Sequence, residues 1–182
     1  YTTSVQVEVA ARNKKNADDF DWDESVIYFM VTDRFFDGNE SNNTASGAKT
    51  YGKDNAGLYH GGDFAGITQK LDYLEDLGIN TIWITPIVEN IPGVTVTDTG
   101  KEDVPYNAAY HGYWASDFTK LNPTLGTKEE FQTLIDQAHN RGIRIMVDIV
   151  VNHAGYDTDF GDMIRSGEDI VSGSDQKDSL SN

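Results

Sequence analysis

The stretch that decides the fold is RIMVDIVVNH, residues Arg144–His153. Its first part is apolar and typical of a buried strand, and its end carries the polar residues Asp148, Asn152 and His153. Because side chains alternate along a strand, Asp148, Val150 and Asn152 are predicted to share one face. Active sites in parallel α/β proteins lie at the carboxyl ends of strands. The stretch therefore indicates an enzyme's strand, although a plain strand end entering a polar loop has the same composition.

Two more strands and two helices are predicted upstream of this stretch. Apolar runs indicate strands at 26–31, 79–84 and 143–151. Apolar residues at three- and four-residue spacing indicate a helix from Phe64 to Leu77, ended by Gly78. A second helix follows the capping-box pattern of Thr127 and Glu130 and ends near Gly142. This alternation predicts an α/β fold with a parallel sheet covered on both faces, while the residues from Pro86 to about Phe118 are predicted to be irregular.

The chain divides into three predicted parts. Residues 1–20 form an upstream segment and linker, in which Tyr1–Ala10 alternates like a lone strand. Residues 21–154 carry the strands and helices, and residues 155–182 are polar and acidic without a clear element. Three parallel strands leave a sheet edge open, and an eight-stranded α/β barrel needs about 250 residues. We therefore expect the chain to be part of a longer protein, or one half of a nicked one.

Composition excludes several classes of partner and site. The formal net charge of the 182 residues is −16, from 30 acidic and 14 basic residues, which argues against nucleic acid and anionic membranes and suits a neutral substrate and calcium. Without cysteine, disulfides and thiolate metal sites are excluded. No apolar run approaches the roughly 18 residues of a membrane span. The first residues show no signal-peptide pattern, which fits both a mature secreted protein and a cytosolic one.

A first candidate binding segment is DGNESNN, residues 37–43. Asp37, Asn39, Asn42 and Asn43 supply side-chain oxygens within a short loop, and calcium takes six to eight oxygen ligands. An EF-hand is excluded because the twelfth loop position is Ala48 rather than Glu. An ordinary Asn-rich turn, or glycosylation at Asn39 or Asn42, would also fit the pattern.

Two further segments carry residues of chemical interest. In HGGDF, residues 60–64, Asp63 is predicted to cap the following helix, and the carbonyl of Gly61 is available as a metal ligand. In YHGYWASD, residues 110–117, aromatic rings beside a histidine suit sugar recognition, because pyranose rings have apolar faces and polar edges. Packing of Tyr113 and Trp114 in the core is the alternative.

Together these segments resemble the α-amylase family of retaining α-glucan-active enzymes. DIVVNH, residues 148–153, matches the family signature D-x-V-x-N-H, and YHGYWASDF resembles its loop after the second strand. DGNESNN, GGDF and VENI, residues 88–91, are similar to the branch that contains bacterial amylases and cyclodextrin glucanotransferases. The resemblance implies the first three βα units of a TIM (β/α)8 barrel, with the start of an inserted domain after the third strand.

The resemblance also implies roles for individual residues. A first calcium would take Asn152 as a ligand between barrel and insert; a second would be bound by Asp37, Asn39, Asn42, Asn43, Gly61 and Asp63. His111 and His153 would hydrogen-bond a glucose ring, Tyr113 would stack on that ring beside Trp114, and Asp148 would lie at the floor of the site. The implied reaction is calcium-dependent cleavage of α-1,4-glucosidic bonds of starch and maltooligosaccharides by a secreted enzyme.

Two departures bear on this expectation. Related glucanotransferases often carry a cysteine where His60 stands here. The family's catalytic Asp, Glu and Asp follow strands four, five and seven, beyond this chain, so the chain alone is expected to be inactive without the C-terminal remainder as its partner. A cyclodextrin glucanotransferase, a maltogenic amylase or a neopullulanase-type enzyme shares these first strands, and a non-catalytic, calcium-dependent glucan-binding module is the alternative from another class.

Overall fold

The computed structural model describes residues 21–95, 106–155, 165–166 and 169–170. The predicted strand at Tyr1–Ala10, the linker to residue 20 and most of residues 155–182 lie outside this part of the chain. Within the described residues, no helix is long and apolar enough to cross a membrane.

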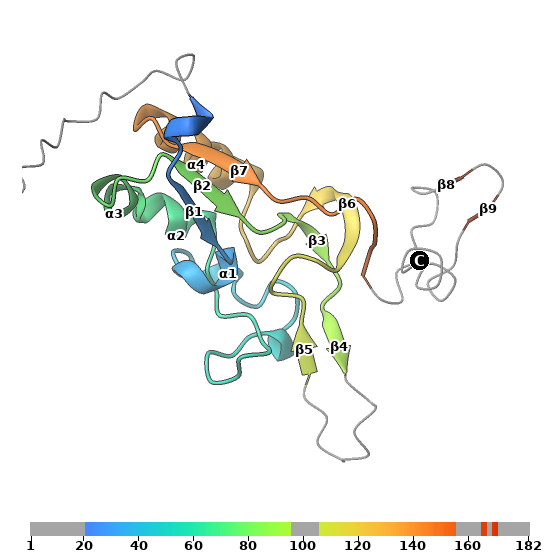
Figure 1. Cartoon of the computed structure of the whole chain (residues 1–182). Coiled ribbons are helices and arrows are strands. Elements are labelled where there is room, and N and C mark those ends of the chain that lie inside the picture. Colours follow the sequence, from blue (N-terminus) through green and yellow to red (C-terminus); the bar gives the residue numbers. More distant parts are fainter. Residues whose placement is uncertain (1–20, 96–105, 156–164, 167–168, 171–182) are drawn as a thin grey trace, which may run out of the picture.

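A three-stranded parallel sheet forms the centre of the structure (Figure 1). Its order is β1 (Ile27–Met30), β2 (Thr81–Ile84) and β7 (Arg144–Val147), with Phe29 opposite Trp83 and Trp83 opposite Met146. Between β1 and β2 lie α2 (Phe64–Gln69) and α3 (Leu71–Asp76), and α4 (Lys128–Asn140) lies between β2 and β7. The predicted order of strand, helix, strand, helix, strand is confirmed.

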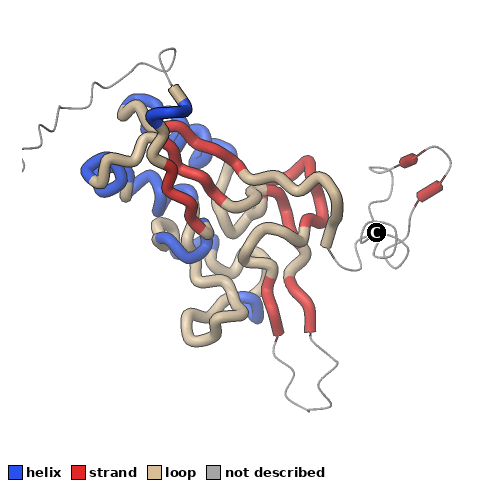
Figure 2. Tube along the Cα trace, in the orientation of Figure 1, coloured by secondary structure: helices blue, strands red, loops and turns tan. Residues whose placement is uncertain are grey.

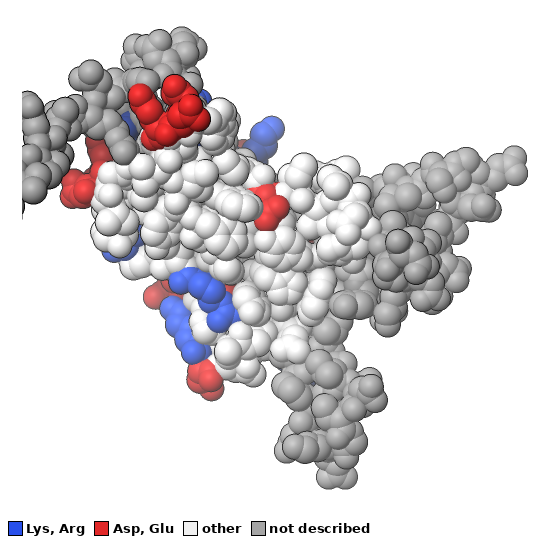
Figure 3. Space-filling view, viewed as in Figure 1, with Lys and Arg blue, Asp and Glu red and all other residues white. Residues whose placement is uncertain are grey.

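The helices cover one face of this sheet. Alternate residues of the strands contact the helices in one core, which includes Met30, Ile82, Ile84, Phe64, Ile67, Leu71, Leu74 and Leu134. On the opposite face, Ile27, Phe29 and Trp83 are 46%, 48% and 36% exposed. The surface over these strands is largely uncharged (Figure 3). The expected cover on both faces is therefore found on one face only among the described residues.

The helix predicted at 64–77 is two helices joined at Lys70. The Thr68 hydroxyl donates to the Phe64 carbonyl at 2.8 Å, a bond that bends helices, and the Lys70 amide donates to Ile67 instead of continuing the α pattern. The buried residues of both helices lie on the same side, so the apolar spacing predicted a single helix. Leu77, the last residue of that spacing, is 52% exposed. The predicted stop at Gly78 is confirmed, with φ of +82°.

The second predicted helix has its expected start. Thr127 Oγ1 accepts from the Glu130 amide at 3.1 Å, and Glu130 Oε2 accepts from the Thr127 amide at 2.7 Å. This capping box satisfies two backbone donors at the start of α4.

Short elements connect the main ones (Figure 2). The prediction of an irregular segment before Phe118 is wrong: β3 (Val88–Asn90) pairs with β6 (Ala115–Leu121), and β4 (Gly93–Thr95) pairs with β5 (Tyr106–Ala108). Register shifts on both sides of Glu89 remove the alternation that reveals a strand. The remaining short elements are α1 (Thr32–Phe35), β8 (Arg165–Ser166), β9 (Asp169–Ile170) and the 3-10 turns Trp22–Glu24, Glu40–Asn42 and Ala48–Thr50.

The strand predicted at 143–151 ends early, at Val147. Its neighbour β2 ends at Ile84, whose carbonyl accepts from the Asp148 amide at 3.0 Å, and Pro86 follows soon after. Beyond Ile84, β2 cannot continue its backbone hydrogen bonds with β7, because Pro86 lacks a backbone donor. The prediction that Asp148, Val150 and Asn152 share one strand face is therefore wrong.

Candidate functional site

The loop of residues 110–114 makes a sharp turn at Gly112. Gly112 has φ of +84°, and a Cβ there would lie 2.4 Å from the Pro86 carbonyl oxygen, so the turn requires glycine. The Trp114 amide donates to Asn90 Oδ1 at 2.6 Å, and the Ile91 amide donates to the Trp114 carbonyl at 2.9 Å. We call residues 110–114 the aromatic loop.

The segment after β7 is bound to the aromatic loop through Tyr113. The Tyr113 hydroxyl donates to Asp148 Oδ2 at 2.7 Å, and this hydrogen bond is the main reason that the pKa of Tyr113 rises to about 12. His153 Nε2 lies 3.0 Å from the Tyr113 carbonyl oxygen. A carbonyl only accepts, so His153 carries a proton on Nε2, and the tautomer that fits this contact has Nδ1 as its acceptor. Asp148, His153 and Tyr113 therefore form one hydrogen-bonded group.

His111 is held in a neutral form within the aromatic loop. Its Nδ1 accepts from the Tyr113 amide at 3.0 Å, which leaves the proton on Nε2. Its ring stacks on Tyr113 with centroids 5.7 Å apart and meets the Trp114 ring edge-on at 4.6 Å. Burial lowers the pKa of His111, since it disfavours the charged imidazolium. A neutral donor beside aromatic rings and a carboxylate can recognise a ligand that has hydroxyl groups and apolar faces.

A second group of polar side chains surrounds Asp63, which is fully buried. Its Oδ1 accepts from the amides of Gly66 and Gly38, and its Oδ2 accepts from the Asn39 amide and from Asn42 Nδ2, at 2.7 to 3.1 Å. The predicted helix cap is confirmed. Burial raises the pKa of Asp63, and these four donors oppose that effect.

Among the residues that the structure describes, three buried oxygens in the same region have no hydrogen-bond donor: Oδ1 of Asp37, Asn42 and Asn43. Asp37 Oδ2 accepts from Asn43 Nδ2 and from Lys53 Nζ, each at 2.9 Å. A Cβ at Gly61 would lie 2.4 Å from Asn43 Oδ1 and 2.7 Å from Asp37 Oδ2, so glycine leaves room between these oxygens. Buried oxygens without donors are costly in a protein alone and are what a hard cation binds. We call residues 37–43 with Gly61 the cation loop.

The family sequence model described as alpha amylase, catalytic domain, matches residues 29–178 of the chain. The chain belongs to the alpha-amylase family. It is 43% identical over 158 residues to the periplasmic alpha-amylase of Escherichia coli, a match that covers 83% of this chain and 23% of that protein. It is also 43% identical over 155 residues to a cyclomaltodextrin glucanotransferase of Geobacillus stearothermophilus, covering 84% of this chain and 20% of that protein.

Solved structures of the alpha-amylase family have the same arrangement of chain. The cyclomaltodextrin glucanotransferase CldA matches with a TM-score of 0.65 at 34% identity, over 75% of this chain and 27% of CldA. An alpha-amylase of Geobacillus thermoleovorans, solved with acarbose, matches with a TM-score of 0.56 at 34% identity, over 75% and 25% of the two chains. The chain thus spans about a fifth to a quarter of the length of the proteins that it matches.

The structure brings most of the predicted residues of this alpha-amylase family member into two groups. Four of the five predicted sugar-binding residues, His111, Tyr113, Asp148 and His153, are joined by hydrogen bonds, and Trp114 contacts the ring of His111. Among the predicted metal ligands, Asn39 and Asp63 have oxygens that already accept hydrogen bonds, and Asn152 is exposed in a bend. Their predicted roles in metal binding remain predictions.

Asp33, Arg34 and Lys53 were missed by the sequence reasoning. Asp33 is 2% exposed and accepts from the amides of His60 and Gly61. Burial raises the pKa of Asp33, and these two amides together with Arg34 oppose that effect. Asp33 is the third residue after β1 and Asp148 the first after β7, so both lie near the carboxyl end of a strand, and the argument applied to Asp148 would have found Asp33. The contact of Lys53 with Asp37 and those of Arg34 with Ala56 and Leu58 have no such local signal, because these partners are distant in sequence.

Proposed function

We propose that this chain forms the N-terminal part of the catalytic domain of a calcium-dependent, α-amylase-type glycoside hydrolase. The reaction would be the cleavage of α-1,4-glucosidic bonds of starch and maltooligosaccharides with retention of configuration. The observation that carries this proposal is the hydrogen-bonded group of His111, Tyr113, Asp148 and His153 in a chain that belongs to the alpha-amylase family.

Each residue of this group has a distinct role in the proposal. The Nε2–H of His111 donates to a glucose hydroxyl, and Nδ1 of His153 accepts from another. Tyr113 and Trp114 provide aromatic surface for the apolar face of a sugar ring. Asp148 holds the Tyr113 hydroxyl at 2.7 Å and so fixes the orientation of that ring. These groups bind and orient substrate; none of them is assigned the bond-breaking step.

We propose that the catalytic carboxyl groups come from the remainder of the enzyme. A retaining glycosidase needs two carboxyl groups about 5–5.5 Å apart. Asp148 is the carboxylate of the hydrogen-bonded group, and its partner is the Tyr113 hydroxyl rather than a second carboxyl group. The exposed sheet face of Ile27, Phe29 and Trp83 supports the proposal that further barrel strands complete the fold, with these three βα units as its first part and an inserted domain after β7.

We propose that the cation loop binds calcium. The residues fit this ion, because Oδ1 of Asp37, Asn42 and Asn43 is buried without a donor among the described residues, and Gly61 leaves room beside Asn43 Oδ1 and Asp37 Oδ2. When bound, calcium supplies positive charge to these oxygens and stabilises the loop. The Gly61 carbonyl, Asn39 and Asp63 complete the proposed ligand set, and Asn152 is proposed for a separate calcium between barrel and inserted domain.

A transglycosylating enzyme is the second candidate. The chain is 43% identical both to a periplasmic alpha-amylase and to a cyclomaltodextrin glucanotransferase, so identity favours neither. The periplasmic relative supports a location outside the cytoplasm for the proposed enzyme.

The test uses the complete enzyme, the 182-residue chain and maltoheptaose as substrate. We expect the complete enzyme to release shorter maltooligosaccharides whose new ends are first in the α configuration, as read by NMR, and the chain alone to release none. Replacing His111 with Gln should raise the KM of the complete enzyme. Cyclic products would assign the transferase, binding without turnover would assign a glucan-binding module, and turnover by the chain alone would overturn the proposed division of roles.

A further inference from the structure

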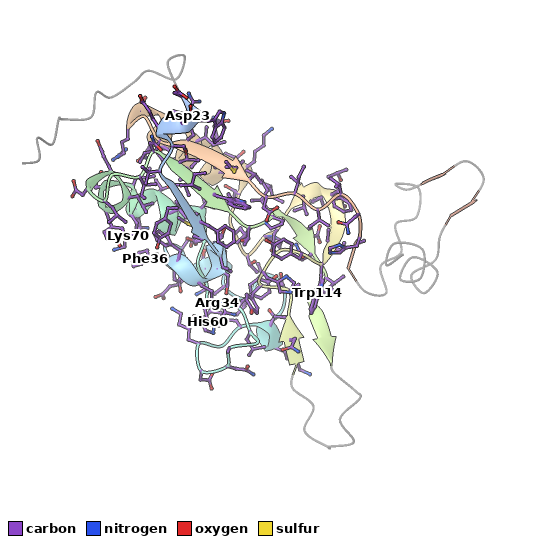
Figure 4. All side chains as sticks on the ribbon, viewed as in Figure 1. Asp23, Arg34, Phe36, His60, Lys70 and Trp114 are labelled. Carbon is purple, nitrogen blue, oxygen red and sulfur yellow. The ribbon has the colours of Figure 1, made fainter. Side chains whose placement is uncertain are left out.

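Arg34 contacts the aromatic loop and the segment that leads to Gly61 of the cation loop. It belongs to α1, directly after β1. Its guanidinium forms an ion pair with Asp33, with Nε 2.7 Å from Oδ2, and its Nη2 donates to the carbonyls of Ala56 and Leu58 at 2.9 and 2.7 Å. Figure 4 shows Arg34 and His60 next to each other below α1. The edge of the guanidinium is thus occupied by the segment that leads to Gly61.

His60 adds a contact that depends on its tautomer. Nη1 of Arg34 lies 3.2 Å from Nδ1 and 3.1 Å from Nε2 of His60, and Nε2 also lies 3.1 Å from the Asn55 carbonyl oxygen. Whichever ring nitrogen is unprotonated can accept from Arg34. Asp33, the other partner of Arg34, accepts from the Gly61 amide at 3.1 Å. Arg34 is therefore linked to the glycine of the cation loop through one intervening residue.

The flat face of the same guanidinium contacts the aromatic loop. The Cζ atom of Arg34 lies 3.8 Å from the centroid of the Tyr110 ring. Tyr110 precedes His111, and their rings meet edge to face with centroids 5.4 Å apart. Only arginine can donate from the edges of a planar cation while the face of that cation stacks on a ring. Lysine cannot replace it, because its ammonium is a point charge.

We propose that Arg34 is a positioning residue that places His111 for glucan binding through Tyr110. Its edge is fixed by the segment before Gly61, and its face determines where the Tyr110 ring lies. The order of the cation loop is thereby transmitted to the neutral histidine of the aromatic loop. The statement about glucan rests on the proposed function; the statement about the position of the loop does not.

The experiment compares Arg34→Met, Arg34→Lys and the control Arg141→Met in the complete enzyme. Arg141 is a matched control, because its side chain is 27% exposed against 25% for Arg34, and it also pairs with an aspartate, Asp72 at 2.8 Å, but far from the aromatic loop. Amide hydrogen exchange over residues 109–114 is measured first, without ligand. We expect exchange in Arg34→Met to be faster by roughly 3- to 30-fold, the range that follows from the strength of cation–π contacts.

Arg34→Lys separates charge from planar stacking. It keeps a cation near Asp33, so we expect it to recover stability but not the slow exchange of the aromatic loop. Arg141→Met should lower stability and leave this loop unchanged. If Arg34→Met leaves exchange at residues 109–114 unchanged, or if Arg34→Lys restores it fully, the proposal is wrong.

Maltoheptaose kinetics give the second measurement. We expect Arg34→Met to raise KM more than it lowers kcat, and Tyr110→Leu to have the same effect. The double variant should be no worse than either single one, whereas Tyr110→Phe, which keeps the stacked ring, should behave as wild type. If the effects of Arg34→Met and Tyr110→Leu on KM add up in the double variant, Arg34 does not act through Tyr110. A wild-type enzyme without activity would refute the proposed function, while hydrogen exchange would still decide the role of Arg34.

Discussion

The cation loop and the aromatic loop differ in how their polar groups are satisfied. In the aromatic loop, the Tyr113 amide donates to His111, its hydroxyl donates to Asp148, and its carbonyl lies 3.0 Å from His153 Nε2 in the segment after β7. In the cation loop, three buried oxygens have no donor among the described residues. Tyr113 thus has protein partners for its polar groups, whereas the three oxygens of the second arrangement are the ones that the proposed calcium would bind. Removing the proposed calcium should therefore affect stability, while changes in the aromatic loop should mainly affect ligand binding.

Loss of the Asp63 carboxylate should lower the stability of the cation loop more than any of the changes that follow. Asp63→Ala removes the acceptor for four donors in a buried place, which leaves those donors unpaired. We expect the free energy of unfolding to fall by more than about 3 kcal/mol, measured by urea denaturation. Asp63→Asn keeps one acceptor and should lose less. A loss below about 1 kcal/mol for Asp63→Ala would show that the cation loop does not depend on this cap.

Removal of calcium should have the next largest effect. If the ion binds the native state, chelation should lower the free energy of unfolding by about 2.7 kcal/mol relative to calcium at one hundred times its Kd. The measurement is thermal unfolding with and without chelator. Gly61→Ala, whose Cβ would lie 2.4 Å from Asn43 Oδ1, should remove this calcium response. A response of equal size in Gly61→Ala would place the calcium elsewhere.

Tyr113→Phe tests whether the aromatic loop is complete by itself. The pKa of Tyr113 is raised to about 12 by its hydrogen bond to Asp148, above the ordinary value of 10.0. The stabilisation from this bond is therefore fully present below pH 10 and is lost as the pH rises through about 12. We expect the variant to be less stable by about 1 kcal/mol at pH 7, allowing for solvent screening.

The measurement for Tyr113→Phe is urea denaturation of both proteins at pH 7 and at steps above pH 10. The stability difference should shrink over those steps. A difference that stays constant would mean that the hydroxyl of Tyr113 contributes through packing rather than through Asp148.

Lys53→Met should have the smallest effect, and only on the cation loop. The Lys53 ammonium lies 2.9 Å from Asp37 Oδ2, and this hydrogen bond raises the pKa of Lys53. A charge so close to the proposed calcium opposes its binding, though water screens it. We expect calcium to bind the variant about threefold to fivefold more tightly in calorimetry. Lys120→Met, a variant of an exposed lysine that pairs with Asp117, is the control and should leave the affinity unchanged.

Much of the fold was predictable because its signals are local. The spacing of Leu71 and Leu74, the caps at Asp63 and Thr127 and the stop at Gly78 each act within a few residues. The predictions failed where a distant neighbour decides: β7 ends at Val147 because its partner β2 ends, and β3 pairs with β6 in an irregular register. The sequence of either strand alone does not determine this pairing.

The sequence by itself determined the order of strands and helices, the family and the residue types of both loops, because periodicity, caps and motifs are properties of short segments. Only the tertiary structure decided which oxygens of Asp37, Asn42 and Asn43 lack donors and that Arg34 joins the Tyr110 ring to the segment before Gly61. These features depend on burial and on the approach of side chains far apart in the chain, and such contacts exist only once the sheet and its loops have packed.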